Sequence, residues 1–116
     1  MLALTDPERL AHFKACLSWW NYECYVHWKR LPAEWIRREL DGVSLREFAR
    51  LMCDYVEAGG RVDEVAESRE PWCNWYAFHH DIRMTVLGRN LYIETVLDQG
   101  REPEDSSITV VNVHDA

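Results

Sequence analysis

The stretch from residue 77 to residue 100, AFHHDIRMTVLGRNLYIETVLDQG, predicts a β-hairpin. Apolar and polar residues alternate on both sides of its central loop, which is the period of a strand with one buried face. A glycine at the first loop position is typical of a type II′ turn, so we expect Gly88-Arg89 to form a two-residue turn. This turn fixes a register in which Arg83 opposes Glu94, a favourable cross-strand pair.

The alternation gives the hairpin one apolar face and one polar face. We expect helices to cover the apolar face, which carries Phe78, Ile82, Met84, Leu91 and Ile93. His80 falls on this face, where a buried and hydrogen-bonded histidine is expected. The polar face carries His79, Asp81, Arg83, Glu94 and Asp98, and the expected register places Asp98 opposite His79.

Three helices are expected before the hairpin. Apolar residues recur at steps of three and four from Leu10 to Leu31, which predicts one long helix over residues 6–30. Thr5 and Glu8 have the spacing of a capping box at its start. A short helix is expected over residues 33–40, and a third begins at Ser44 and ends at the glycines at 59 and 60.

The remaining segments complete an α+β fold. Residues 108–114 predict a third strand in a meander with the hairpin, and residues 61–66 could add a fourth. We therefore expect three N-terminal helices, the first one long, packed on a small antiparallel β-sheet. Residues 1–116 would form a single domain, with a helical half at 1–60 and a sheet half at 61–116.

Composition indicates a small soluble intracellular domain. The first 13 residues contain no apolar core of a signal peptide, and no run of residues is long and apolar enough to span a membrane. The four cysteines include no C-x-x-C pair, so buried thiols in a reducing compartment are expected. These features favour the cytoplasm, and no motif calls for a cofactor.

Charge and aromatic content favour a protein partner. The chain has a net charge of −7, and residues 61–116 hold eleven acidic and five basic residues. A negative surface repels phosphate backbones, so nucleic-acid binding is disfavoured. Six tryptophans are a large number for 116 residues, and Trp19 and Trp28 are candidates for a binding surface or for the seam of a homodimer.

The polar hairpin face offers the candidate site for chemistry. His79, Asp81 and Asp98 are the candidate metal ligands, since imidazole and carboxylate groups bind divalent ions. Arg83 lies among them, and a fixed cation opposes a metal ion, so we expect none.

The order of elements, helices followed by an antiparallel sheet with His, Arg and Glu, resembles that of small ribonuclease toxins of the RelE and barnase type. No family motif matches residue by residue. The resemblance implies RNA cleavage with His79 or Glu94 as the base and Arg83 at the phosphate. The leading hypothesis is a non-catalytic protein-interaction or regulatory module, and a small hydrolase or ribonuclease is the alternative.

Overall fold

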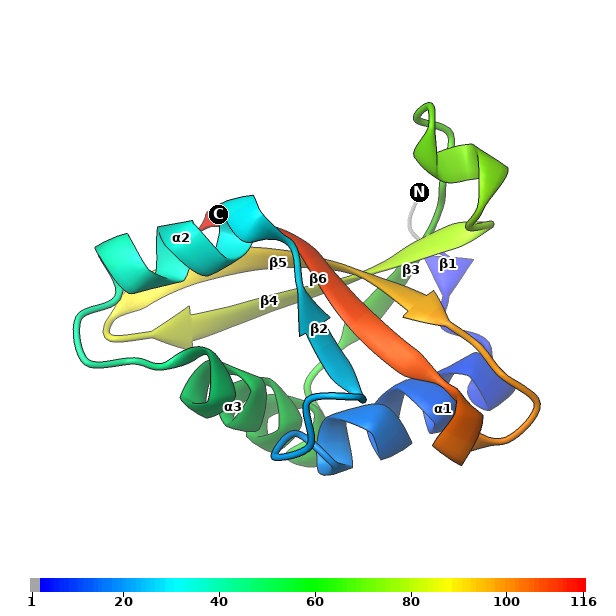
Figure 1. The fold of residues 1–116 in the computed structure, drawn as a ribbon, viewed down its shortest axis with the longest axis horizontal. Coiled ribbons are helices and arrows are strands. Elements are labelled where there is room, and N and C mark those ends of the chain that lie inside the picture. The colour runs from blue at the N-terminus through cyan, green and yellow to red at the C-terminus, as the bar shows by residue number, and fades with distance from the viewer. Residues whose placement is uncertain (1–2) are drawn as a thin grey trace.

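A six-stranded mixed sheet forms the centre of the computed structural model, which describes residues 3–116 and their side chains from Thr5 onward (Figure 1). The strands follow one another across the sheet in the order β1-β3-β4-β5-β6-β2. Neighbours are antiparallel except β2, which pairs in parallel with β6. The strands are β1 (Ala3–Leu4), β2 (Val26–Trp28), β3 (Val62–Ala66), β4 (Phe78–Val86), β5 (Arg89–Asp98) and β6 (Ser107–Asp115).

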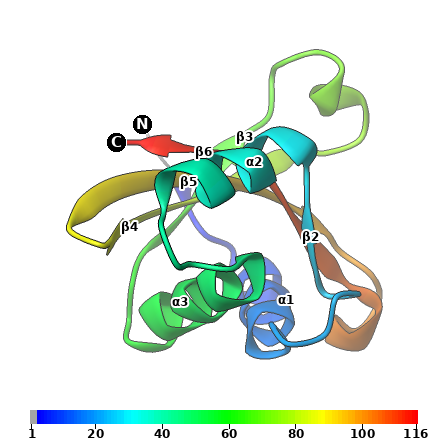
Figure 2. The same cartoon turned by 60° about the vertical axis from the view of Figure 1, so that its left-hand side comes forward.

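Three helices accompany this sheet: α1 (Pro7–Ser18), α2 (Arg30–Glu39) and α3 (Leu45–Glu57). Figures 1 and 2 show α1 and α3 together on one face, while α2 follows β2 and lies along β6 at the edge of the sheet. Two short 3-10 turns, Trp72–Asn74 and Pro103–Asp105, lie in the connections before β4 and β6. The largest buried side chains join helices and sheet in one core: Phe13, Leu17, Ile36, Phe48, Met52, Ile82, Leu91 and Ile93.

The predicted fold class is α+β in outline but wrong in its architecture, because the sheet is mixed and takes strands from both ends of the chain. The long helix expected over residues 6–30 ends at Ser18, and its second half turns back to form β2. Val26 and Trp28 suit a strand, and pairing with β6 stabilises that conformation over the helical one. Helical spacing of apolar residues was therefore misleading from Trp19 onward.

The helix ends agree with the sequence in part. Asp6, not Thr5, caps α1, because its carboxylate accepts hydrogen bonds from the backbone N–H groups of Glu8 and Arg9. The Thr5 hydroxyl donates instead to the carbonyl of Val62 in β3. Ser44 caps α3 as expected.

The hairpin exists, but its register differs by two residues from the expected one. Leu87 and Gly88 form the loop, with φ angles of 51° and 75°. Positive φ at both central positions is the mark of a type I′ turn, not of the expected type II′ turn. Arg83 therefore opposes Tyr92, and Glu94 opposes Asp81. A shift of two preserves the faces, so the apolar face still meets the helices.

The segment at 61–66 holds a strand, β3. β4, β5 and β6 are antiparallel neighbours inside the six-stranded mixed sheet, so the small three-stranded antiparallel sheet that was expected is wrong. No helix in residues 3–116 is both long and apolar enough to cross a bilayer. The expectation that residues 1–13 are not a signal peptide stays a prediction, and residues 1 and 2 lie outside the described residues.

Candidate functional site

The outer face of β4 carries a buried histidine–carboxylate pair. His79 and Asp81 lie two residues apart on the strand, so their side chains point the same way. His79 Nδ1 lies 2.8 Å from Asp81 Oδ1, and the Tyr92 hydroxyl donates to Asp81 Oδ2 at 2.7 Å. Burial and the bond to Asp81 raise the pKa of Tyr92. Asp81 thus has a partner on each carboxylate oxygen.

Arginines neutralise the neighbouring acids on this face. Arg69, from the β3–β4 connection, hydrogen bonds with both Glu94 and Glu67, with Nη1 3.3 Å from Glu94 Oε1 and Nη2 2.9 Å from Glu67 Oε2. The hydrogen bonds from Arg69 lower the pKa of Glu67. Arg83 binds Asp63, with Nη1 3.2 Å from Oδ2, and its guanidinium lies 5.0 Å from the centre of the Tyr92 ring.

The expected metal-ligating and catalytic residues come together only in part. His79, Asp81 and Glu94 are buried, and their ligand atoms lie within 4.8 Å of one another, close enough to surround a divalent ion. Asp98, the third expected ligand, pairs with Ser107 further along β5 and is exposed. Arg69 already binds Glu94, and a metal ion would have to displace it. Arg83 faces Tyr92 and Asp63 and not Glu94, so the expected Arg83–Glu94 pair is wrong.

The inner face of β4 carries a second histidine–carboxylate pair. His80 is 1% exposed, and its Nε2 lies 3.1 Å from Glu64 Oε1 on β3. Arg9 of α1 binds the same carboxylate through two nitrogens, with Nη2 2.9 Å from Glu64 Oε2. This guanidinium lowers the pKa of Glu64 to about 2, and burial lowers the pKa of His80.

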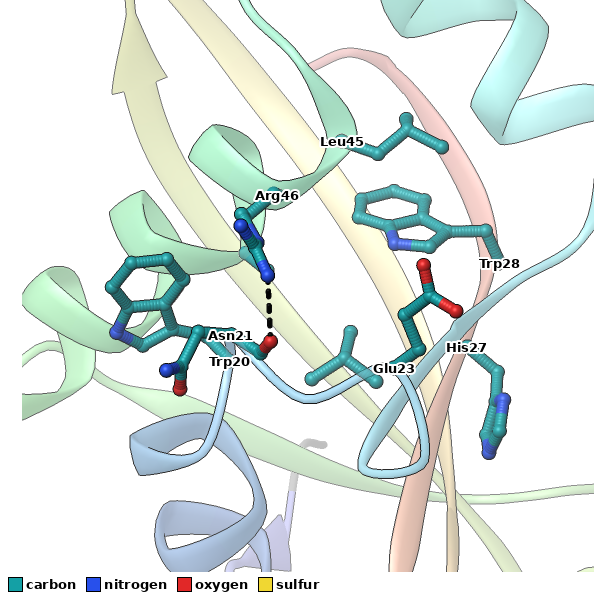
Figure 3. Close-up of a pocket in the computed structure, with 9 residues that line it drawn as sticks. Trp20, Asn21, Glu23, His27, Trp28, Leu45 and Arg46 are labelled. Atoms are coloured by element: carbon teal, nitrogen blue, oxygen red, sulfur yellow. Dashed lines mark hydrogen bonds between the residues drawn. The ribbon is translucent and has the colours of Figure 1, made fainter.

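A third feature is a pocket of about 310 Å³ between the sheet edge and α3. Figure 3 shows Trp20 and Trp28 on opposite sides of this edge pocket, with the Glu23 side chain directed toward Trp28. Arg46 of α3 crosses to the loop before β2 and donates from Nη2 to the Asn21 carbonyl at 2.9 Å. Glu23 forms no ion pair among residues 5–116.

The edge of the sheet beside this pocket has free backbone groups. β2 is an outer strand, and the Tyr25 carbonyl and the Lys29 N–H bond to β6. Because backbone groups alternate in direction along a strand, those of Val26 and Trp28 point away from β6. The backbone groups of Val26 and Trp28 thus face away from β6, and those of Trp28 are the more accessible, since Val26 is 6% exposed. Another strand could pair at this edge.

One residue at this pocket, Trp28, was predicted from the sequence as a binding candidate. Trp28 lines it and packs edge-on against Phe48. Trp19 lies outside it and packs at a tilt of 46° against Tyr25, with ring centres 4.6 Å apart. Trp20 and Glu23 had no local signal, because their stretch followed a helical pattern and the turn that places them depends on β2 pairing with β6.

No protein-family model matches this chain, and neither the curated proteins nor the solved structures include one similar enough to match it.

Proposed function

We propose that this chain is a protein-interaction module that binds an extended, basic peptide segment along the free edge of β2. One observation carries this proposal: the outward backbone groups of Val26 and Trp28 lie beside a pocket with two indole walls. In strand addition, main-chain hydrogen bonds supply affinity and an adjacent pocket selects a side chain.

The chemistry of the edge pocket favours an arginine or lysine side chain. Indole faces attract cations, and the Glu23 carboxylate, which forms no ion pair within residues 5–116, is directed into the space beside Trp28. Among the described residues that line the pocket, only His27 and Arg46 are basic. Arg46 is held in a hydrogen bond to the Asn21 carbonyl. A net charge of −7 would also speed association with a basic partner.

Other observations support the same class of function less directly. All four cysteines are free thiols, which supports the proposed cytoplasmic location, although only Cys16 and Cys53 are buried as expected and Cys24 and Cys73 are exposed. The hydrolase alternative has less support, because Arg83 and Glu94 each bind an internal partner and are not free to act on a substrate.

A pair of matched peptides tests the proposal. We expect the acetylated and amidated peptide Thr-Val-Arg-Val-Thr to shift the NMR signals of the Val26 and Trp28 amides and of the Trp20 and Trp28 indoles. The same peptide with Glu in place of Arg should bind with an affinity at least about tenfold lower, because a like charge would face Glu23. Equal binding of both peptides, or shifts confined to other strands, would contradict the proposal.

Two variants separate the edge pocket from general charge effects. Glu23→Lys should abolish the preference for the arginine peptide, while Glu70→Lys, at an exposed acid outside the pocket, changes the net charge by the same two units and should retain it. Sedimentation at several protein concentrations covers self-association: if a dimer forms and the same amides shift without peptide, a second copy of this chain occupies the edge instead.

A further inference from the structure

A second pocket, of about 270 Å³, lies on the inner side of the sheet and reaches the ring of His80. We call it the His80 pocket. Its size is just below the range of sites for drug-sized ligands, so it suits a molecule with one ring. Its walls combine aromatic and polar side chains: Arg9, Trp75, Tyr76, Phe78, His80 and Asp98.

His80 lines this pocket, and one of its ring nitrogens has no hydrogen-bond partner among the described residues. The ring is 1% exposed, and its Nδ1 has no hydrogen-bond partner among the described residues. Glu64 is ionised and can only accept, so the His80 Nε2 that faces it carries the ring proton. Burial lowers the pKa of His80, which keeps the ring neutral. Nδ1 therefore presents a lone pair and requires a donor.

The charges around the pocket select against an anion. Arg9 is bonded through two nitrogens to Glu64, and its guanidinium lies 4.4 Å from the centre of the Phe78 ring, so its charge is already balanced and its position fixed. Asp98 lines the same pocket and forms no ion pair among residues 5–116. One unbalanced negative charge remains, which favours a neutral or cationic ligand.

From these observations we propose that the His80 pocket binds a small aromatic molecule, neutral or positively charged, that donates an N–H or O–H to His80 Nδ1. Trp75, Tyr76 and Phe78 supply the apolar contacts for the ring, and His80 selects the donor. This site is separate from the edge pocket beside β2, so the two proposals stand or fall independently.

Three related probes test the proposal on the ¹⁵N-labelled full chain. Benzamide should shift the amides of residues 76–78 and 97–99 and the imidazole ¹⁵N signal of His80 Nδ1. N,N-dimethylbenzamide has the same ring and carbonyl but no N–H, and it should bind about tenfold more weakly, as expected for one lost hydrogen bond. Benzoate should bind more weakly than benzamide because Asp98 repels it.

Two variants identify the contacts. His80→Phe should remove the difference between benzamide and N,N-dimethylbenzamide. Gln99→Trp, at an exposed position that lines the pocket, should fill it and abolish binding of both while leaving His80 and the core intact, so it decides the matter if His80→Phe does not fold. The proposal is overturned if benzamide leaves these amides unshifted, if the two amides bind the wild-type chain equally well, or if Gln99→Trp binds benzamide unchanged.

Discussion

Both faces of β4 bury a histidine beside a carboxylate, but the two carboxylates have different partners. His79 and His80 are neighbours in sequence, and each pairs with a carboxylate. On the outer face, Asp81 is hydrogen bonded to both His79 and Tyr92. Arg69 binds two carboxylates there, those of Glu94 and Glu67. On the inner face, a single carboxylate, that of Glu64, serves both Arg9 and His80.

The stability of the inner face therefore depends mainly on one residue, Glu64. The outer network is redundant, since Arg69 binds two carboxylates and its side chain is 50% exposed, so it can exchange a lost partner for water. The acids are buried on both faces, with the Glu94 side chain 6% exposed and that of Glu64 4%, but Glu64 alone serves both Arg9 and His80. Polar groups that lose a partner in a buried position cost more free energy than those that water can reach.

The largest expected effect comes from removing the charge of Glu64. Glu64→Gln should lower the free energy of unfolding by about 2–4 kcal/mol, because the amide cannot accept from Arg9 and His80 as a carboxylate does. The matched change on the outer face, Glu94→Gln, should cost about 1 kcal/mol or less, since Arg69 keeps Glu67 and solvent. Urea unfolding at pH 7 measures both, and equal losses would contradict the difference between the two faces.

Acid should destabilise the inner face in two steps. Burial lowers the pKa of His80, so the unfolded chain binds a proton at pH values where the folded chain does not, and stability should fall as the pH drops below about 6.5. The pKa of Glu64 is lowered to about 2, so its contribution is present above about pH 4.3 and is lost between pH 4.3 and 2.

Thermal unfolding across this pH range separates the two steps. Because Glu64 also raises the pKa of His80, the effect of Glu64→Gln is measured in a His80→Phe background, where the loss of stability should be constant above pH 5 and shrink below about pH 4.3. His80→Phe should show a smaller loss than wild type between pH 7.5 and 5.5. A Glu64→Gln difference that grows on acidification would have the wrong sign for a lowered pKa.

The sequence was sufficient where one element explains itself. The helix α3 and the two faces of the hairpin follow from periodicity and capping within a few residues. β2 could not be found this way, because Val26–Trp28 becomes a strand only by pairing with β6, eighty residues later. Only part of the polar site was predicted from the sequence, for the same reason. His79 and Asp81 lie on one strand, whereas Arg69 comes from a loop that carries no local sequence signal.

The register of the hairpin decides which residues the outer face brings together, and a single loop residue tests it. Leu87 has a φ of 51°, a conformation that branched apolar side chains adopt at a cost, and it is 64% exposed, so its side chain contributes little packing. Asn-Gly is a preferred pair for a type I′ turn, so Leu87→Asn should stabilise the chain by about 0.5–1 kcal/mol without moving any cross-strand contact. Urea unfolding measures the gain, and NMR contacts between the backbone of Asp81 and Glu94 verify the register. In the type II′ alternative, Leu87 would be an ordinary strand residue, and asparagine there would weaken the hairpin. A loss of stability would therefore favour the register in which Arg83 lies opposite Glu94. In that register the contacts described for the outer face would be wrong, and with them the comparison between the two faces.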